Sequence, residues 1–478
     1  MKKLALIFLI LIIAFSCFAC VNDNGDGDEE GEVTEKTYSN YSVDYADSAT
    51  KVEDANGVKL TFSEPTTFNT VVLKEKGDVI REFRFYYLND KGEKTFIYKQ
   101  DLVDSYRYCS FERITTTEFT IEIKGVEGEE WKLEDVEIYD MGGTEEEFRV
   151  TAYAVSQYTY KKESLEKEHF KAITHVNLIS TVFISEDGEI YFLDNVIDGT
   201  LVDGETIFKT SLENVRSVVE EGTTIVATLL GQDRNGSGLD TITIHERAFK
   251  SKNFITNAVA FQEKYGLDGL SFDYEYPETM AQYRLMFETC RSLKEAMAPG
   301  SIMTVALGTW TLSKPLIFDK SLMECVDWVE SMNYDEMRED KHNYHSSFSQ
   351  SCYDFFNKIE LINETFGDAP ASYTDIKAIN LGLPFYSRPT DGRGYWGDYK
   401  NVAESLGKYE NVKYDEYYNG ELLPPTYYNS YQMVYDKVCY AIDSGVGGVM
   451  VWHYSCDMPW DSGLSLWRAI YEAVQSRS

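Results

Sequence analysis

Two carboxyl side chains stand two residues apart in the segment YGLDGLSFDYEYP, residues 265–277. Polar and hydrophobic residues alternate here, and in an extended strand residues two apart share a face. Ser271, Asp273 and Glu275 are therefore expected on one face, and the hydrophobic residues that alternate with them on the other. Like charges this close raise the pKa of one carboxyl, which can then hold and donate a proton near neutral pH. The pattern predicts a general acid, Glu275, with Asp273 as its electrostatic partner; the alternative is an acidic loop in an acidic chain.

The wider pattern around this pair resembles the catalytic signature of glycoside hydrolase family 18, which reads DGxDxDxEYP. The matching residues are Asp268, Gly269, Asp273, Glu275, Tyr276 and Pro277. Ser271 stands where the family usually has its middle aspartate, and Tyr274 stands where chitinases often have tryptophan. The resemblance implies that Glu275 protonates the leaving glycosidic oxygen.

Eight short hydrophobic segments, alternating with helical patterns, must position these residues. The predicted strands are 149–154, 175–179, 224–230, 269–274, 302–307, 328–333, 379–383 and 448–452. Eight such alternations over residues 148–478 predict an α/β fold, a (β/α)8 TIM barrel with helices such as 283–297 in its outer ring. Chemistry in these barrels sits at the carboxyl ends of the strands, and Glu275 follows the fourth strand.

Other strand ends carry further motifs that resemble the same family. The segment MNYD, residues 332–335, follows strand six and resembles MxYD; PFYSR, residues 384–388, follows strand seven and resembles PFYGR. Trp452 ends strand eight, where the family keeps a tryptophan beneath the −1 sugar, and Tyr153 is the expected aromatic residue of strand one. Each alone also fits a structural role, such as a core side chain or a helix cap. Their order along the chain favours the family.

The resemblance implies a mechanism in which the substrate's own N-acetyl group replaces the carboxylate nucleophile of ordinary retaining glycosidases. The acetamido carbonyl would attack C1, while Asp273 and Tyr334 orient and stabilise that group. Glu275 would act first as acid and then as base toward water. The residues implied to bind the sugars are Asp335, Tyr386, Arg388, Trp452, Tyr153, Met332 and Ser271. No cofactor is implied.

Three departures from the family pattern bear on the site. The third strand ends TLLG, residues 228–231, without the first glycine of the family's SxGG. The segment 389–426 is short, so the α+β insertion of processive chitinases is expected to be reduced or missing, which implies a shallower, endo-acting or short-substrate site. Ser271 cannot take up the proton that an aspartate there would share with Asp273, so an altered pH dependence is expected.

Residues 38–142 show short alternating segments broken by turns, without long helical patterns. The expected strands are 58–62, 70–73, 82–88, 94–98 and 119–123 of an all-β sandwich. The region resembles discoidin-like (factor V/VIII type C) domains, which are galactose-binding-like jelly rolls often used as carbohydrate-binding modules. The resemblance implies a glycan-binding role or a structural one. Such modules often hold a structural calcium, but the sequence does not locate one here.

Residues 1–20 have a positively charged start and a hydrophobic stretch too short to span a bilayer, which predicts a signal peptide. Cys17 and Cys20 follow small residues, and the segment resembles bacterial lipoprotein signals whose cysteine is lipidated, with Cys20 favoured. Residues 21–37 are acidic and glycine-rich, and are expected to form a disordered tether. The resemblance implies a lipoprotein of the bacterial cell envelope, outer-surface or periplasmic, that meets the membrane only through its lipid anchor.

The composition narrows the classes of partner. Acidic residues outnumber basic ones 80 to 45, and the net charge of −35 would repel the phosphates of nucleic acid. The cysteines after residue 20 lack metal-ligand spacing, and His342 and His345 are the only close histidine pair, so neither a metal site nor a disulfide framework is indicated. A neutral glycan that contains N-acetylglucosamine is compatible with this charge.

Three functions agree with the sequence. Cleavage of β-1,4 bonds after N-acetylglucosamine in chitin or chito-oligosaccharides is favoured, because EYP after the catalytic pair is chitinase-like. An endo-β-N-acetylglucosaminidase that acts on N-glycans is the alternative within the class. A non-catalytic lectin on the same barrel is the alternative outside it; such lectins typically lose the acid, and Glu275 is present.

Overall fold

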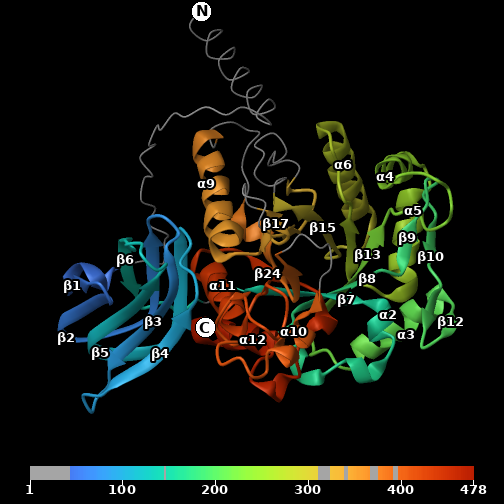
Figure 1. Cartoon of the computed structure of the whole chain (residues 1–478). Coiled ribbons are helices and arrows are strands. Elements are labelled where there is room, and N and C mark those ends of the chain that lie inside the picture. Colours follow the sequence, from blue (N-terminus) through green and yellow to red (C-terminus); the bar gives the residue numbers. More distant parts are fainter. Residues whose placement is uncertain (1–42, 145–146, 310–322, 338–342, 367–374, 391–396) are drawn as a thin grey trace, which may run out of the picture. The chain divides into compact units, whose positions relative to one another are not determined.

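The computed structural model describes residues 43–144, 147–309, 323–337, 343–366, 375–390 and 397–478 (Figure 1). All of them belong to one compact unit, residues 39–478. The predicted signal peptide with Cys17 and Cys20, the acidic tether and His342 lie outside the described residues.

Eight parallel strands close into a barrel in the C-terminal part of the chain (Figure 1). Around the ring they are β7 (Arg149–Val155), β8 (His175–Ile179), β13 (Thr224–Leu230), β14 (Gly269–Asp273), β15 (Ile302–Gly308), β16 (Trp328–Met332), β19 (Ile379–Pro384) and β24 (Gly448–Trp452). Pairing of β24 with β7 and of β8 with β13 closes the ring. The predicted TIM barrel is confirmed, and each predicted strand ends within about one residue of the observed one.

Helices on the outside of the barrel connect successive strands. The longer ones are α3 (Gly204–Arg216), α4 (Thr241–Lys250), α5 (Phe254–Tyr265), α6 (Met280–Ala296), α9 (Phe355–Phe366), α11 (Tyr431–Asp443) and α12 (Leu466–Arg477); α2 (Ser156–Thr159) and α10 (Tyr399–Ser405) are short. Local signals fix the two helix ends on either side of β14. Gly266 ends α5 with a φ of 58°, in the left-handed region that favours glycine, and Thr279 and Gln282 form a capping box at the start of α6.

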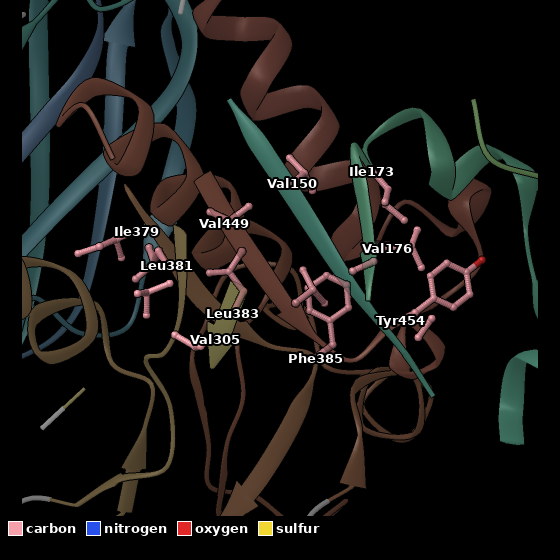
Figure 2. Close-up of a cluster of buried hydrophobic side chains, with 14 of the residues drawn as sticks. Val150, Ile173, Val176, Val305, Ile379, Leu381, Leu383, Phe385, Val449 and Tyr454 are labelled. Carbon is pink, nitrogen blue, oxygen red and sulfur yellow. The ribbon is translucent and has the colours of Figure 1, made fainter. Parts of the chain in front are cut away.

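Side chains on the barrel strands alternate between the helix side and the barrel interior. On β14, Leu270 and Phe272 pack in the helix-side core, and Ser271 and Asp273 take the opposite face. Figure 2 shows part of the same core, with Leu383 of β19 among its labelled side chains. The interior strand positions include the buried polar residues Thr151, Asn177, Thr228, Ser271, Thr304, Glu330 and Asn380. The predicted division of faces is confirmed for Ser271 and Asp273, whereas Glu275 lies beyond the end of β14.

Short strands follow several barrel strands. β9 (Val182–Ile184) and β10 (Ile190–Phe192) extend the barrel sheet, and β11 (Asn195–Ile197) pairs with β12 (Thr200–Val202). β17 (Glu336–Met337) pairs with β18 (Asn343–His345). After β19, a small four-stranded sheet contains β20 (Tyr386–Pro389), β21 (Gly397–Asp398), β22 (Tyr417–Tyr418) and β23 (Thr426–Tyr427). This small sheet lies where the sequence predicts a reduced insertion.

Six antiparallel strands form a sheet in the N-terminal part of the described chain. They are β1 (Thr50–Asp54), β2 (Gly57–Glu75), β3 (Ile80–Leu88), β4 (Lys94–Gln100), β5 (Tyr106–Gly125) and β6 (Leu133–Tyr139), in the order β1-β2-β5-β3-β4 with β6 on β2. The predicted all-β region is confirmed, but β2 joins two predicted strands across Pro65. Its pairing with β5 is irregular between Thr61 and Thr66, so the proline interrupts no regular ladder there. One continuous sheet therefore surrounds the core in which Phe68 contacts Phe119.

The N-terminal sheet shares a buried interior with the barrel. Lys99 donates a hydrogen bond to Asp415 at 2.7 Å and Arg107 donates one to Glu416 at 3.4 Å, and all four side chains are buried. Hydrophobic residues of β2 and β5 belong to the same core cluster as the residues under the barrel helices. Neither region is therefore packed independently of the other.

The six cysteines of the described chain are buried, and none of them is in a disulfide. Within the same residues no helix is both long enough and apolar enough to cross a membrane. Nor do the described ranges contain a group of three or more His, Cys, Asp or Glu side chains that could hold a metal ion.

Candidate active site

The carboxyl pair predicted from the sequence follows the fourth barrel strand. Asp273 is the last residue of β14, and Glu275 follows two residues later with an exposed side chain. At the start of the strand, the carboxylate of Asp268 accepts a hydrogen bond from the backbone N–H of Ile225 at 2.7 Å. At Gly269 a Cβ atom would lie 2.0 Å from a carbonyl oxygen of β15. The first two motif residues therefore position β14, and the last two carboxyls are presented at its end.

The two carboxyls have different surroundings. Burial, and then the adjacent Glu275, which is also its hydrogen-bond partner, raise the pKa of Asp273 well above its ordinary value. Asp273 therefore holds a proton at pH values at which an exposed aspartate is ionised. The sequence predicted a raised pKa on Glu275. The structure shows one on Asp273, because this side chain ends in the barrel interior, where its Oδ1 atom is buried.

Four residues implied to bind or orient the sugar meet in one cluster at the strand ends. Tyr153 of β7 is buried in it, and Met332, Tyr334 and Trp452 pack against it. The ring centroids of Tyr153 and Trp452 are 5.7 Å apart. Burial, followed by the neighbouring Tyr386 and Tyr153 and by both carboxyls of the pair, raises the pKa of the Tyr334 hydroxyl. Tyr334 therefore remains a hydrogen-bond donor at neutral pH.

Asp335 and Arg388 form an ion pair next to this cluster. Nε and Nη2 of Arg388 donate to the two carboxylate oxygens of Asp335 at 2.6 and 2.7 Å. The guanidinium lies 5.3 Å from the centre of the Tyr386 ring. Burial alone would raise the pKa of Asp335, but hydrogen bonds from Arg388 and His345 outweigh it and lower that pKa. Asp335 is therefore a carboxylate that can accept hydrogen bonds from hydroxyl groups.

Ser271 lies two residues before Asp273 on the same face of β14, and its side chain is fully buried. In the barrel register it is flanked by Thr228 and Thr304, and its hydroxyl neighbours that of Tyr153. A hydroxyl buried at this depth does not reach the surface. Any effect of Ser271 on substrate would pass through Asp273 or Tyr153.

His345 is a buried member of this site that the sequence analysis missed. It contacts Asp335 and the backbone of Tyr386. The sequence marked it only as a close pair with His342, a pattern that was considered for metal binding alone. The nine residues between Asp335 and His345 carry no pattern that predicts their contact, because a hairpin brings the two side chains together.

Glu330 is a second missed residue, buried in the barrel interior on β16. It accepts hydrogen bonds from Nε1 of Trp328 at 2.7 Å and from Nδ2 of Asn380 at 3.0 Å. Burial raises the pKa of Glu330 to about 7. A charged residue inside a hydrophobic strand pattern was the signal that could have found it.

A cavity of about 910 Å³ opens where β7, β8 and β24 end. Its lining includes Val155, Tyr158, Ser180 and Tyr454. None of the residues predicted for the site lines it, although Tyr454 follows Trp452 by two residues. The cavity therefore lies next to the site and does not contain the carboxyl pair.

Fold and site together define a class of protein. A buried carboxyl that holds its proton and an exposed carboxyl end the fourth strand of a (β/α)8 barrel, with aromatic rings and an ion pair at neighbouring strand ends. This is the arrangement of an acid–base enzyme. Residues 149–457 match the family model described as Glycosyl hydrolases family 18. The chain belongs to this family, and its barrel is a chitinase-like glycoside hydrolase domain.

Comparison with individual proteins agrees with this assignment. Chitinase A1 of Niallia circulans is 25% identical over an alignment of 260 residues, and the match covers 43% of this chain and 37% of that relative. The match thus spans little more than a third of the relative's length. The crystal structure of a chitinase from Bacteroides thetaiotaomicron is 21% identical, with a TM-score of 0.52 over 69% of this chain and 97% of that one.

A second solved structure is the Ostrinia furnacalis Group II chitinase catalytic domain 2, a mutant in complex with penta-N-acetylchitooctaose. It is 18% identical, with a TM-score of 0.52, and the match covers 70% of this chain and 98% of that one. At this identity both structural likenesses show the fold.

Proposed function

We propose that this chain is a retaining glycoside hydrolase that cleaves β-1,4 bonds after N-acetylglucosamine in chitin or chito-oligosaccharides. The observation that carries the proposal is the carboxyl pair. Asp273 keeps its proton because it is buried, and Glu275 is exposed. A protonated carboxyl in the barrel interior is a poor nucleophile, which argues against a glycosyl ester on Asp273. The acetamido group of the substrate would supply the nucleophile instead.

In the proposed mechanism Glu275 donates its proton to the glycosidic oxygen as the C1–O bond breaks. The acetamido carbonyl oxygen bonds to C1 and gives an oxazolinium ion. The Tyr334 hydroxyl, which keeps its proton, donates a hydrogen bond to this group, and Asp273 orients its N–H. Glu275, now a carboxylate, takes a proton from the water that attacks C1, and the oxazolinium ring opens as its bond to C1 breaks. Two inversions at C1 retain the configuration.

Several features support an oligosaccharide substrate. The carboxylate of Asp335 would accept hydrogen bonds from sugar hydroxyls, and Trp452 would stack beneath a ring. The cavity next to Trp452 offers room for further sugar units. The names of the Niallia and Bacteroides relatives, and the chito-oligosaccharide held by the Ostrinia domain, support chitin. The small sheet after β19 supports a shallow, endo-acting site.

Mass analysis of products from chitohexaose and from a high-mannose glycoprotein tests the proposal, with wild type and Glu275→Gln. Glutamine keeps the shape of the side chain and removes its proton transfer, so hydrolysis is expected to fall about 10²- to 10⁴-fold with unchanged thermal unfolding. Shortened chito-oligomers from wild type alone support the proposal. Glycans released with one N-acetylglucosamine left on the protein would favour the N-glycan enzyme. Binding without cleavage by wild type would favour a lectin.

We also propose that residues 38–142 bind a glycan, which rests on their resemblance to discoidin-like domains. The test is a glycan array probed with full-length Glu275→Gln in the presence of saturating chitohexaose. Binding that chitohexaose does not displace would support a second glycan site. Complete displacement would favour a structural role for the N-terminal sheet.

A third proposal concerns localisation. The sequence of residues 1–20 supports export and lipid anchoring of the chain in a bacterial cell envelope. Metabolic labelling with an alkyne fatty acid is expected to label wild type, and either Cys20→Ala or Cys17→Ala should remove the label. A label that survives the double substitution, or wild type without any label, would contradict the anchor.

A further inference from the structure

His345 lies fully buried between the Asp335 carboxylate and the backbone of β20. Its Nδ1 atom is 3.3 Å from Oδ1 of Asp335. Its Nε2 atom is 2.9 Å from the carbonyl oxygen of Tyr386. The centroids of the His345 and Tyr386 rings are 4.7 Å apart. Both nitrogens of the imidazole therefore face hydrogen-bond acceptors.

The protonation state of the imidazole decides how many of these contacts are hydrogen bonds. A neutral imidazole carries a proton on one nitrogen only. With the proton on Nε2, Nδ1 turns a lone pair toward the Asp335 carboxylate. With the proton on Nδ1, Nε2 turns a lone pair toward the Tyr386 carbonyl. The imidazolium alone donates to both acceptors.

The backbone holds both partners of this contact in an uncommon conformation. Asp335 and His345 each have a φ of 59°, in the left-handed region that residues other than glycine seldom adopt. Glu336, the neighbour of Asp335, pairs with His345 in the hairpin of β17 and β18. Ser346, the next residue, donates to the carbonyl oxygen of Asn333 at 2.6 Å. Strained positions of this kind persist where the surrounding structure fixes them, and they concentrate at functional sites.

We propose that His345 is a further positioning residue of this site: as an imidazolium it links Asp335 to the backbone of β20 and so fixes the carboxylate that Arg388 holds. Both strand ends that carry the ion pair are then joined through one ring. With its proton on Nε2, which faces the nearer acceptor, the neutral imidazole turns a lone pair toward the Asp335 carboxylate, and the carboxylate loses that support. Substrate binding through Asp335 is therefore expected to be tighter at acid pH. The inference rests on the proposed function of the site.

The charges around His345 set the direction of its titration. Burial lowers the pKa of His345, the Asp335 carboxylate opposes this effect, and the Arg388 cation adds to it. Because burial prevails, the imidazolium forms below the ordinary value of 6.5 and is lost as the pH rises through the lowered pKa. Two further charged groups lie on the elements packed here: Glu336 on the paired strand, and Lys437, which donates to Ser346.

Two substitutions separate the two contacts. The amide nitrogen of asparagine takes the place of Nδ1, and asparagine tolerates a left-handed backbone. The amide nitrogen of glutamine takes the place of Nε2. His345→Asn thus keeps a donor toward Asp335 at every pH, and His345→Gln keeps only the donor toward Tyr386. His175→Asn, at the start of β8 and so at the opposite end of the barrel, is the matched control.

The first readout is the pH dependence of KM for chitohexaose. In wild type and in His175→Asn, KM is expected to rise about tenfold from acid to neutral pH, the size of a charge-assisted hydrogen bond. KM of His345→Asn should stay near the acid wild-type value, and KM of His345→Gln near the neutral one, while kcat keeps the same pH profile in all four. A KM of His345→Asn that follows the wild-type pH profile would overturn the proposal.

The second readout does not need turnover. Nitrogen-15 shifts of the His345 ring, assigned by their loss in His345→Asn, report its protonation in the unliganded enzyme. Two protonated nitrogens at acid pH and one at neutral pH are expected. A ring that stays neutral down to the acid limit of folding would overturn the proposal. If chitohexaose is not cleaved at all, the proposed function fails, and these shifts still decide the protonation of His345.

Discussion

Asp273 and Glu275 are chemically similar side chains whose surroundings differ because of where β14 ends. Asp273 is still part of the strand and points into the barrel, where burial favours its neutral form. Glu275 lies beyond the strand and is exposed, so it can exchange a proton with a substrate and with water. The folded state binds a proton on Asp273 that the unfolded chain releases at its ordinary pKa. Ionisation of Asp273 therefore lowers the free energy of unfolding as the pH rises.

Ser271 gives a prediction about this pair. Ser271→Asp places another carboxyl beneath Asp273, and a like charge at this distance makes Asp273 hold its proton to higher pH. The alkaline limb of the pH–rate profile is expected to move up by about one pH unit or more. Activity should remain, because Asp273 and Glu275 are both present. The measurement is kcat/KM for chitohexaose across pH.

Ser271→Asn is the matched control for this experiment, since asparagine has the shape of aspartate without its charge. Its profile is expected to keep the wild-type alkaline limb. Both variants place a larger polar group in a buried position, so both should lose roughly 1–3 kcal/mol of stability. Identical pH–rate profiles for Ser271→Asp and wild type would contradict the prediction.

At the scale of elements, the end of β16 is shaped by a glycine on the neighbouring strand. A Cβ atom at Gly382 of β19 would lie 2.3 Å from the carbonyl oxygen of Ser331 and 3.1 Å from the Tyr334 ring. These two strands pair in the barrel, so their spacing is fixed by the ladder. Gly382 therefore provides the space in which the Tyr334 ring lies.

Gly382→Ala is expected to displace the end of β16 and the Tyr334 ring with it. Because orientation of the reacting groups is sensitive to shifts of about 1 Å, kcat should fall roughly ten- to a hundredfold. Overpacking should also cost about 1–3 kcal/mol of stability. Gly407→Ala, where the nearest atom would be 3.2 Å away and the residue follows α10, is the control. Steady-state kinetics in which both variants match wild type would contradict this account.

At the scale of the whole molecule, the N-terminal sheet is part of the packed interior of the enzyme. Arg107 of β5 is buried at the junction, 3.4 Å from a carboxylate oxygen of Glu416 and 4.0 Å from one of Asp436. Glu416 precedes β22, which belongs to the same small sheet as β20 and its Arg388. The N-terminal sheet therefore supports the region of the barrel that carries the Asp335–Arg388 pair.

Removal of Arg107 should destabilise the whole chain. Arg107→Ala leaves the carboxylates of Glu416 and Asp436 buried without their cation, which is expected to cost about 3–5 kcal/mol. Lys94→Ala removes one member of an exposed pair with Glu122 and should cost no more than about 1 kcal/mol. Urea unfolding of the full chain compares the two losses. Equal, small losses would mean that the sheet and the barrel are energetically independent.

Periodicity and motif order let the sequence by itself determine the eight barrel strands, the two faces of β14 and the residues at the strand ends. These are local properties, because the alternation of side chains follows from the geometry of an extended backbone. The sequence was less accurate for the N-terminal sheet, where the two predicted strands 58–62 and 70–73 form one strand, β2, with an irregular pairing between them. Glycan binding by the discoidin-like region and the lipid anchor stay proposals.

The tertiary structure decided which carboxyl of the pair keeps a proton, which groups surround Asp335, and that the two regions share a core. Each depends on residues far apart in the chain: Arg388 meets Asp335 across 53 positions, and Lys99 meets Asp415 across 316. The pKa of a group depends on its burial and its neighbours, which a linear pattern does not contain. For the same reason His345, unremarkable in the sequence, became a candidate positioning residue only once the hairpin placed it between two acceptors.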